Sequence, residues 1–163
     1  MIPTNPDLAA TDAVIEVLKT LTVEYPDGER EDFQYLQVDA GYVSTPTRYP
    51  YVSVHTGDAR IVPARLGRGD QMVAHDVDVD CVVSIEYEDA HSAERGYRRM
   101  TQIRWDALRH LLQHRETLRD RGISFVNFEE TALNYLTPDD GGYQEWGFTG
   151  VVMLPLTVKF RGV

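Results

Sequence analysis

Cysteine is almost absent from this sequence, and its scarcity excludes several kinds of site. The one cysteine, Cys81, permits neither an intramolecular disulfide nor a structural zinc site with several thiolate ligands. Cys81 falls in an alternating stretch with Val79 and Val83 on its own side, which predicts a buried thiol and not a nucleophile. Apolar runs are short too, as in residues 151–156, against the roughly 18 residues that a membrane-spanning helix needs. We therefore expect no membrane span.

Positive charge is scarce, and lysine especially so. The chain has 26 acidic and 16 basic residues, a formal net charge of −10, and only Lys19 and Lys159 are lysines. Such a surface repels DNA and anionic lipid, so general nucleic-acid or membrane binding is disfavoured. The preference for arginine over lysine and for aspartate over glutamate fits a GC-rich genome or a high-salt cytoplasm, and both explanations stay open. The N-terminus lacks the basic cluster and apolar stretch of a secretory signal, which predicts a cytoplasmic start.

Sequence motifs that carry catalysis are also missing. The glycines of residues 67–70 and 141–142 do not have the spacing of a phosphate-binding loop, and there is no nucleophile elbow. His110 and His114 stand four residues apart, but neither a glutamate base nor a third ligand accompanies them, so we expect surface histidines. His75 is expected to be a core histidine that bonds a backbone group. The sequence thus predicts a protein that is not an enzyme and has no metal or cofactor.

The clearest pattern that is present is an alternation of apolar and polar residues over positions 71–88. It predicts a long strand with one buried side and one side that is wet or faces a partner. Asp76, Asp78 and Asp80 lie on the polar side. Alternate residues of a strand are roughly 6.5 to 7 Å apart, which is too open for one metal coordination shell. We therefore expect a charged surface there and no metal site.

Hydrophobic periodicity and turn residues predict the other elements. Helices are expected at about residues 8–20, capped by Asp7 or Thr11, and at residues 92–122, capped by Ser92. The expected strands are residues 33–38, 51–56, 71–88, 123–128 and 143–160. Residues 57–70 should form a flexible or partner-dependent loop. This order predicts one α+β domain over residues 1–163, with a mostly antiparallel sheet, a short N-terminal helix and one long helix packed on one face.

Positive charge is concentrated in the second expected helix. Residues 94–121 hold eight arginines and four acids, a net charge of +4, which leaves −14 for the rest of the chain. Either this is a solvated face with pairs inside the helix, or it meets the acids of another copy. The candidate interface residues are Arg95, Arg98, Arg99 and Arg104 of the helix, Arg60, Arg65 and Arg68 of the loop, and Asp76, Asp78 and Asp80 of the strand. Reversing Arg98 and Arg99 to glutamate is predicted to impair assembly and leave the fold intact.

The whole pattern resembles the tail terminator (tail completion) proteins of long-tailed phages and related archaeal viruses. The resemblance rests on the short N-terminal helix, the Tyr-Pro-Tyr-Val-Ser-Val strand at residues 49–54, the arginine-containing excursion, the long alternating strand, the long helix, and the closing Leu-Pro-Leu-Thr-Val-Lys-Phe at residues 154–160. It spans nearly the whole chain. The resemblance implies a structural virion protein without catalysis. Its ring, most commonly a hexamer, would cap the tail tube and end its polymerisation.

The same resemblance implies particular partners and a location. The partners would be further copies of the chain, the tail tube protein and a neck or connector protein, with DNA passing through the ring without specific binding and no membrane. The location would be the tail–neck junction of the virion, and the host cytoplasm during assembly. Other functions stay open: another head-to-tail connector ring, a tail tube protein, a small-molecule-binding α+β domain or enzyme, or nucleic-acid binding through the arginine helix. A pocket lined by Trp105, Tyr143 or Trp146 would favour the small-molecule function.

Overall fold

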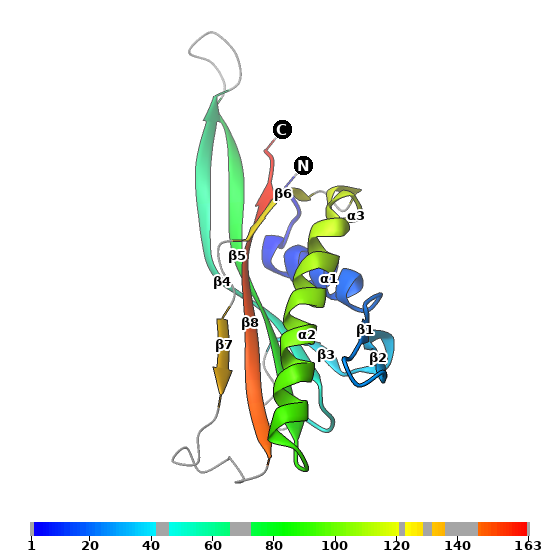
Figure 1. Ribbon diagram of the computed structural model, residues 1–163. Helices are drawn as coiled ribbons and strands as arrows, with labels where there is room; N and C mark the ends of the chain where they lie inside the picture. The colour runs from blue at the N-terminus through cyan, green and yellow to red at the C-terminus, as the bar shows by residue number, and fades with distance from the viewer. Residues whose placement is uncertain are drawn as a thin grey trace.

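A six-stranded sheet with helices over one face organises the chain (Figure 1). The computed structural model describes residues 2–41, 46–65, 73–120, 123–128, 132–135 and 147–162. The sheet order is β3 (Val38–Ala40), β4 (Tyr51–Arg65), β5 (Val73–Asp89), β8 (Phe148–Phe160) and β6 (Ile123–Phe128), and β7 (Ala132–Tyr135) also pairs with β8. Every pairing is antiparallel except that of β3 with β4. The predicted α+β class with a mostly antiparallel sheet is confirmed.

Three helices pack on the same side of this sheet in the described part of the chain (Figure 1). They are α1 (Pro6–Leu18), α2 (Ala93–Gln113) and α3 (Arg115–Asp120). Ser92 caps α2 as predicted, because its hydroxyl oxygen accepts the N–H of Arg95 at 3.1 Å. The predicted caps of α1 are wrong. Asn5 is the cap, and its side chain accepts the N–H of Leu8 at 3.1 Å. Because proline is favoured in the first turn of a helix, α1 begins at Pro6, two residues earlier than predicted.

The long helix expected at residues 92–122 is divided in two. His114 departs from helical geometry, with φ −99° and ψ 23°, and its N–H still bonds the carbonyl of His110 at 3.1 Å. The apolar spacing continues across the break, because Leu111 of α2 and Leu118 of α3 are both buried. The periodicity therefore identified the buried face correctly, although it did not locate the break.

The strand expected at residues 33–38 is wrong. Residues 33–35 form the 3-10 helix η1 (Phe33–Tyr35), which Asp32 caps by accepting the N–H of Gln34 at 3.1 Å. A small hairpin of β1 (Thr22–Glu24) and β2 (Arg30–Asp32) precedes it. The local bond from Asp32 competes with extended backbone and starts this turn of helix, which buries Phe33 completely.

Within the described residues, the strand predicted at residues 71–88 is confirmed as β5, and its alternation is confirmed from residue 79 onward, while residues 71–72 lie outside the described part of the chain. Val79, Cys81, Val83 and Ile85 are buried on the side that the helices cover. The burial of β8 alternates at every position, so the two central strands present one continuous apolar face to α1 and α2. This face and the inner sides of the helices form one contiguous core. None of the described helices combines the length and the apolar character that crossing a membrane requires.

The loop expected at residues 57–70 is largely a strand. Residues 57–65 continue β4 and pair with β5 as far as Arg65 opposite Val73, while residues 66–70 lie outside the described residues. The register shifts between Thr56 and Ala59, which places a β-bulge at Gly57 and Asp58. Glycine here marks a bulge inside a strand and not the start of a flexible loop.

Candidate assembly surfaces

The far ends of β4 and β5 form a two-stranded arm, which we define as residues 61–65 and 73–77. Val77 is the first residue of β5 that pairs with β8, opposite Phe160, so in the described sheet residues 73–76 pair with β4 alone. Figure 1 shows this arm projecting beyond the helical layer. A two-stranded ribbon is only marginally stable in water by itself. Contact with a neighbouring surface would therefore stabilise the arm.

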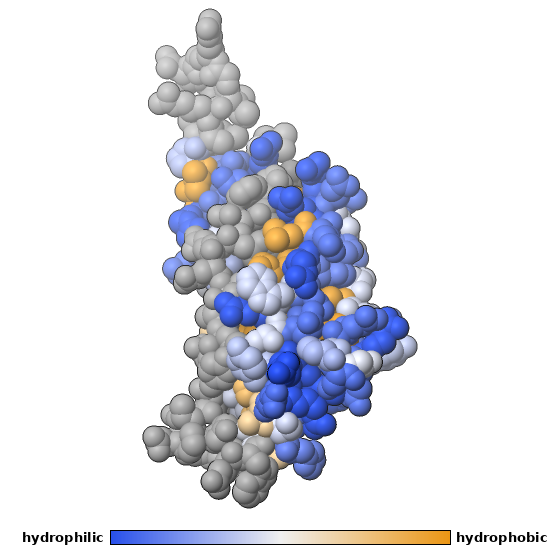
Figure 2. All heavy atoms as spheres, viewed as in Figure 1, coloured by the Kyte–Doolittle hydropathy of each residue, from blue (hydrophilic) through white to orange (hydrophobic). Residues whose placement is uncertain are grey.

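Ile61 and Pro63 are exposed on the side of the arm that continues the core face. Ile61 lies opposite Val77, two pairs beyond the pair of Ala59 with the buried Val79, and 72% of Ile61 is exposed. Figure 2 shows hydrophobic side chains on the arm just below its grey tip. His75 lies on the same strand and is exposed, so the prediction of a core histidine is wrong. The alternation placed His75 correctly on the core side of β5, but the helices do not extend far enough along the strand to cover His75.

The opposite face of the sheet carries the three predicted aspartates, and each has its own partner. Arg60 donates two hydrogen bonds to Asp80, at 2.8 and 2.9 Å, and Thr157 of β8 donates a third to the same carboxylate at 3.1 Å. The Arg60 hydrogen bonds are the main reason why the pKa of Asp80 is lowered. Asp80 therefore ties β4, β5 and β8 together across the sheet.

Asp78 and Asp76 are held separately. The Lys159 ammonium lies 3.6 Å from Asp78 Oδ1, an ion pair that is too long to be a hydrogen bond. Asp76 Oδ1 accepts the N–H of Gly162 at 3.1 Å. The described residues contain no group of three or more histidine, cysteine, aspartate or glutamate side chains that could hold a metal. Because the three carboxylates bind three different partners, their arrangement is that of a polar strand surface.

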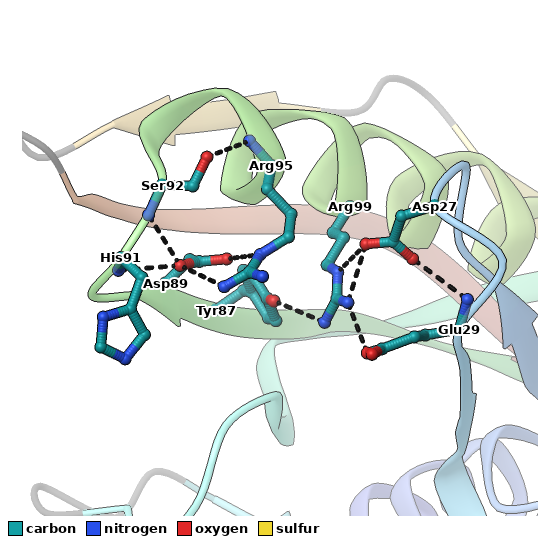
Figure 3. Close-up of polar contacts among 8 residues, drawn as sticks. All are labelled: Asp27, Glu29, Tyr87, Asp89, His91, Ser92, Arg95 and Arg99. Atoms are coloured by element: carbon teal, nitrogen blue, oxygen red, sulfur yellow. Dashed lines mark hydrogen bonds and ion pairs between the residues drawn. The ribbon is translucent and has the colours of Figure 1, made fainter.

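Arg95 and Arg99, two of the predicted interface arginines, lie in an ion-pair cluster inside one chain (Figure 3). Arg95 Nε is 2.6 Å from Asp89 Oδ2 at the point where β5 ends and α2 begins. Arg99 contacts Asp27 at 2.8 Å and Glu29 at 2.6 Å, both in the turn of the β1–β2 hairpin. The cluster joins the end of β5, the start of α2 and the N-terminal hairpin.

Arg99 is the most enclosed member of this cluster, with 13% of its side chain exposed. Its guanidinium carbon lies 4.5 Å from the centre of the Tyr25 ring, and its Nη1 donates a hydrogen bond to the Tyr87 hydroxyl oxygen at 3.3 Å. Burial alone would lower the pKa of Arg99, but hydrogen bonds to Asp27, Glu29 and Tyr87 raise it, so the guanidinium stays charged. Burial in turn raises the pKa of the Tyr25 phenol. Arg99 thus anchors the hairpin to α2.

These contacts explain part of the charge segregation without a second copy. Residues 2–41 contain nine acids and two bases, and this acidic segment packs beside the basic helix of the same chain. The sequence analysis did not identify Asp27, Glu29 and Asp89 as its partners. Asp89 could have been recognised from the sequence, because it stands three residues before the N-cap Ser92. The acidic partners of Arg99, in contrast, lie 70 or more positions away along the chain.

The other predicted interface arginines are placed differently. Arg98 pairs with Glu94 one helical turn away at 3.0 Å, and both side chains are largely exposed. The Arg104 guanidinium lies 5.6 Å from the ring centre of Trp105. Arg68 and the side chain of Arg65 lie outside the described residues. The predicted interface role of Arg98 and Arg104 stays a prediction.

A hollow of about 470 Å³ lies between the β1–β2 hairpin and α2. Its lining is largely polar: Leu21, Thr22, Glu24, Arg30, Gln102, Asp106, Arg109, His110 and Gln113. Trp105 is not in this lining, and Tyr143 and Trp146 lie outside the described residues. The hollow thus lacks the aromatic wall that would favour small-molecule binding.

The two helix histidines serve as local hydrogen-bonding groups. His110 Nε2 lies 3.0 Å from the carbonyl of Val17 and 2.8 Å from the Thr20 hydroxyl, so the imidazole joins α2 to the end of α1. Burial and the neighbouring His114 lower the pKa of His110, which favours the neutral ring. Both histidines are half-buried, so the prediction of surface histidines is only partly right.

Cys81 has the properties that the sequence predicted. Its side chain is buried in the core face of β5, and burial raises the pKa of the thiol to about 12. A thiol with such a pKa is not ionised near neutral pH and is a poor nucleophile.

Comparison with known proteins adds no family to this description. No protein-family model matches the chain, and no curated protein matches it.

Proposed function

We propose that this chain is a structural subunit of a closed ring of the tail terminator type, which caps a tail tube and joins it to the capsid neck. The ring would be made of several copies, six in the commonest arrangement of such proteins. It would act at the tail–neck junction of a virion, after assembly in the host cytoplasm. The tail tube protein and a neck protein would bind opposite surfaces of the ring, and DNA would pass through without specific binding.

One observation carries this proposal: the arm of residues 61–65 and 73–77 projects from the sheet and leaves Ile61 exposed on the side that continues the core face. Ile61 on this ribbon is 72% exposed, and contact with another surface would stabilise the ribbon by removing this side chain from water. A ring subunit meets that requirement, because each copy has a neighbour on either side. The order of helices and strands agrees with the same class of protein.

The proposal also fits the way in which polar side chains are used. The aspartates of β5 and the arginines at the start of α2 hold the fold together by intramolecular pairs. Their positions give no converging set of groups around one substrate position, which an enzyme would need. Another head-to-tail connector ring or a tube protein shares these features, and identification of the bound partner separates these three possibilities.

The first experiment is measurement of mass in solution. Analytical ultracentrifugation or native mass spectrometry, over a wide range of protein and salt concentration, should find a closed oligomer with one defined number of subunits. Addition of the purified ring to polymerising tail tubes should then stop their growth. A protein that stays monomeric over the whole range would contradict the ring. A ring that leaves tube growth unchanged but binds a neck protein would favour another connector ring.

The arm gives a direct variant for the same measurement. Ile61→Ser removes the exposed apolar side chain of the arm and should weaken assembly, while Tyr35→Ser removes an exposed aromatic of η1 and should not. Both side chains are exposed, so both variants should keep the unfolding midpoint of the wild type. Equal assembly by the two variants would remove the arm from the ring contact.

A further inference from the structure

The arm leaves the body of the sheet at an irregular point of the β4–β5 ladder. The bulge at Gly57 and Asp58 lies opposite Asp80 of β5, and the arm begins three residues beyond it. A bulge interrupts the ladder, bends the strand and increases its twist, and a two-stranded ribbon twists more than a wider sheet. The helical layer does not reach the arm (Figure 1). Strand pairing alone therefore leaves the direction of the arm poorly fixed.

A two-point ion pair spans this bulge. Arg60 is in register with Asp78, but its side chain reaches back to Asp80, with Nη1 2.8 Å from Oδ2 and Nη2 2.9 Å from Oδ1. The Thr157 hydroxyl of β8 donates to the same carboxylate at 3.1 Å. A planar guanidinium that bonds both carboxylate oxygens restricts orientation as well as distance. The pair therefore fixes the part of β4 beyond the bulge relative to β5 and β8.

The residues that follow β8 make a second contact, on the arm itself. The pairing of β8 with β5 ends at Phe160 opposite Val77, and the chain then continues beside the arm. Gly162 donates its backbone N–H to Asp76 Oδ1 at 3.1 Å. A Cβ built on Gly162 would lie 2.8 Å from the carbonyl carbon and 3.0 Å from the amide nitrogen of His75. Because backbone atoms cannot move aside as a flexible side chain can, residue 162 fits against the arm only as glycine.

An ion pair lies between these two contacts and completes a row. Lys159 Nζ is 3.6 Å from Asp78 Oδ1. The three aspartates occupy alternate positions of β5, so they share the face of the strand that lies away from the helices. Their partners follow in order along β8 and just past it, so the row runs from the body of the sheet onto the arm. The contacts of the row are Asp80 with Thr157, Asp78 with Lys159, and Asp76 with Gly162.

We infer that this row, together with Arg60, is a brace that sets the direction of the arm. The brace acts on the face of the sheet opposite Ile61, so it leaves that side chain available to another molecule. In the proposed ring, an arm that is already held in place would reach a neighbouring copy without a further loss of conformational freedom. This consequence rests on the proposed ring, whereas the brace itself belongs to a single copy.

Hydrogen exchange of the backbone amides tests the brace in protein that has been diluted until its mass shows only monomers. Gly162→Ala displaces residue 162 from His75, and Asp76→Ala removes the acceptor for its N–H. Each should speed the exchange of the arm amides by at least about tenfold, because the arm then opens more often. Amides of residues 79–87 and of α2 should keep the rates of the wild type. Asp76→Asn retains an oxygen acceptor and should restore the slow exchange.

Two variants serve as matched controls. Arg161→Ala changes the exposed residue next to Gly162, and Glu88→Ala removes an exposed acid from the same face of β5 at its other end. Neither should change the exchange of the arm amides. Circular dichroism checks that every variant is folded. In the measurement of mass, Gly162→Ala and Asp76→Ala should assemble at least about tenfold more weakly than the wild type, since a loose arm must be ordered on binding.

The outcomes separate the brace from the ring. Unchanged exchange of the arm amides in both Gly162→Ala and Asp76→Ala would overturn the brace, as would a wild-type arm that exchanges as fast as an unfolded chain. Faster exchange with normal assembly would overturn the effect of the brace on the ring contact. A wild-type protein that stays monomeric would overturn the ring, and the exchange measured on that monomer would still decide the brace. Faster exchange, weaker assembly and recovery of both in Asp76→Asn would establish the brace and its effect on the ring.

Discussion

Arg95 holds Asp89 in a two-point ion pair where β5 gives way to α2, with Nε 2.6 Å from Oδ2 and a terminal nitrogen 3.1 Å from Oδ1. Asp89 Oδ1 also accepts the N–H groups of His91 and Ser92, at 2.9 and 3.0 Å. Only 3% of the Asp89 side chain is exposed, so these donors replace the water that an ionised carboxylate requires. The pair fixes the corner between the sheet and its main helix.

Asp89→Asn should therefore destabilise the protein by about 2 kcal/mol near neutral pH. Hydrogen bonding to Arg95, aided by the two backbone N–H groups, lowers the pKa of Asp89 to about 2. Because the folded pKa lies below the unfolded one, the stabilisation is complete above about pH 4 and is lost as the pH falls towards 2. Urea unfolding at several pH values measures it. A difference between wild type and Asp89→Asn that stayed constant down to about pH 3 would contradict this assignment.

Arg99→Ala should lower the free energy of unfolding by about 2 kcal/mol, because it removes charged hydrogen bonds from a largely enclosed site. Arg98→Ala is the matched control and should change it by less than about 0.5 kcal/mol, since the pair with Glu94 is exposed. Denaturant titration measures both, and equal effects would show that Arg99 is no anchor. The predicted reversal of Arg98 together with Arg99 is consequently a poor test of assembly, because it would damage the fold.

Gly96→Ala should destabilise the protein by about 1 to 3 kcal/mol, although alanine is the better helix former. A Cβ built on Gly96 would lie 2.7 Å from Cγ and 2.8 Å from Cδ1 of Phe148, so α2 could no longer approach β8 as closely. Gly57→Ala is the control, since its Cβ would meet nothing nearer than the Asp80 carbonyl oxygen at 4.0 Å. Thermal unfolding compares the two. Gly96→Ala with a raised melting temperature would mean that Phe148 moves aside without cost.

Calcium or magnesium at submillimolar concentration should leave the melting temperature unchanged. Asp76, Asp78 and Asp80 each engage a different group, and their side chains do not share one coordination shell. Differential scanning fluorimetry with and without each ion makes the measurement, with Asp78→Ala as the control variant. A large, saturable increase that Asp78→Ala abolishes would show a metal site on this face.

Much of the fold followed from periodicity in the sequence. The period-two pattern of β5 and the apolar spacing of α2 identified the buried faces correctly, because such patterns depend only on which side of an element is covered. Ser92 was recognisable as a cap because capping is a local bond. The same approach failed at residues 33–35, where a competing local bond from Asp32 makes a 3-10 turn, and at residues 57–65, where glycine marks a bulge.

The sequence by itself determined the α+β class, the buried thiol of Cys81 and the polar side of β5, since each depends on local pattern and composition. Only the tertiary structure decided which charged side chains form ion pairs within the chain. Arg99 and Arg98 are neighbours in the sequence, yet the chain brings Asp27 and Glu29 to the first and leaves the second with Glu94 at the surface. Ion pairs between distant residues depend on how the elements pack, and neither the composition nor the spacing of residues predicts which distant residues will meet. The same holds for the arm, because Ile61 stays 72% exposed although it lies opposite Val77, which still pairs with Phe160 of β8.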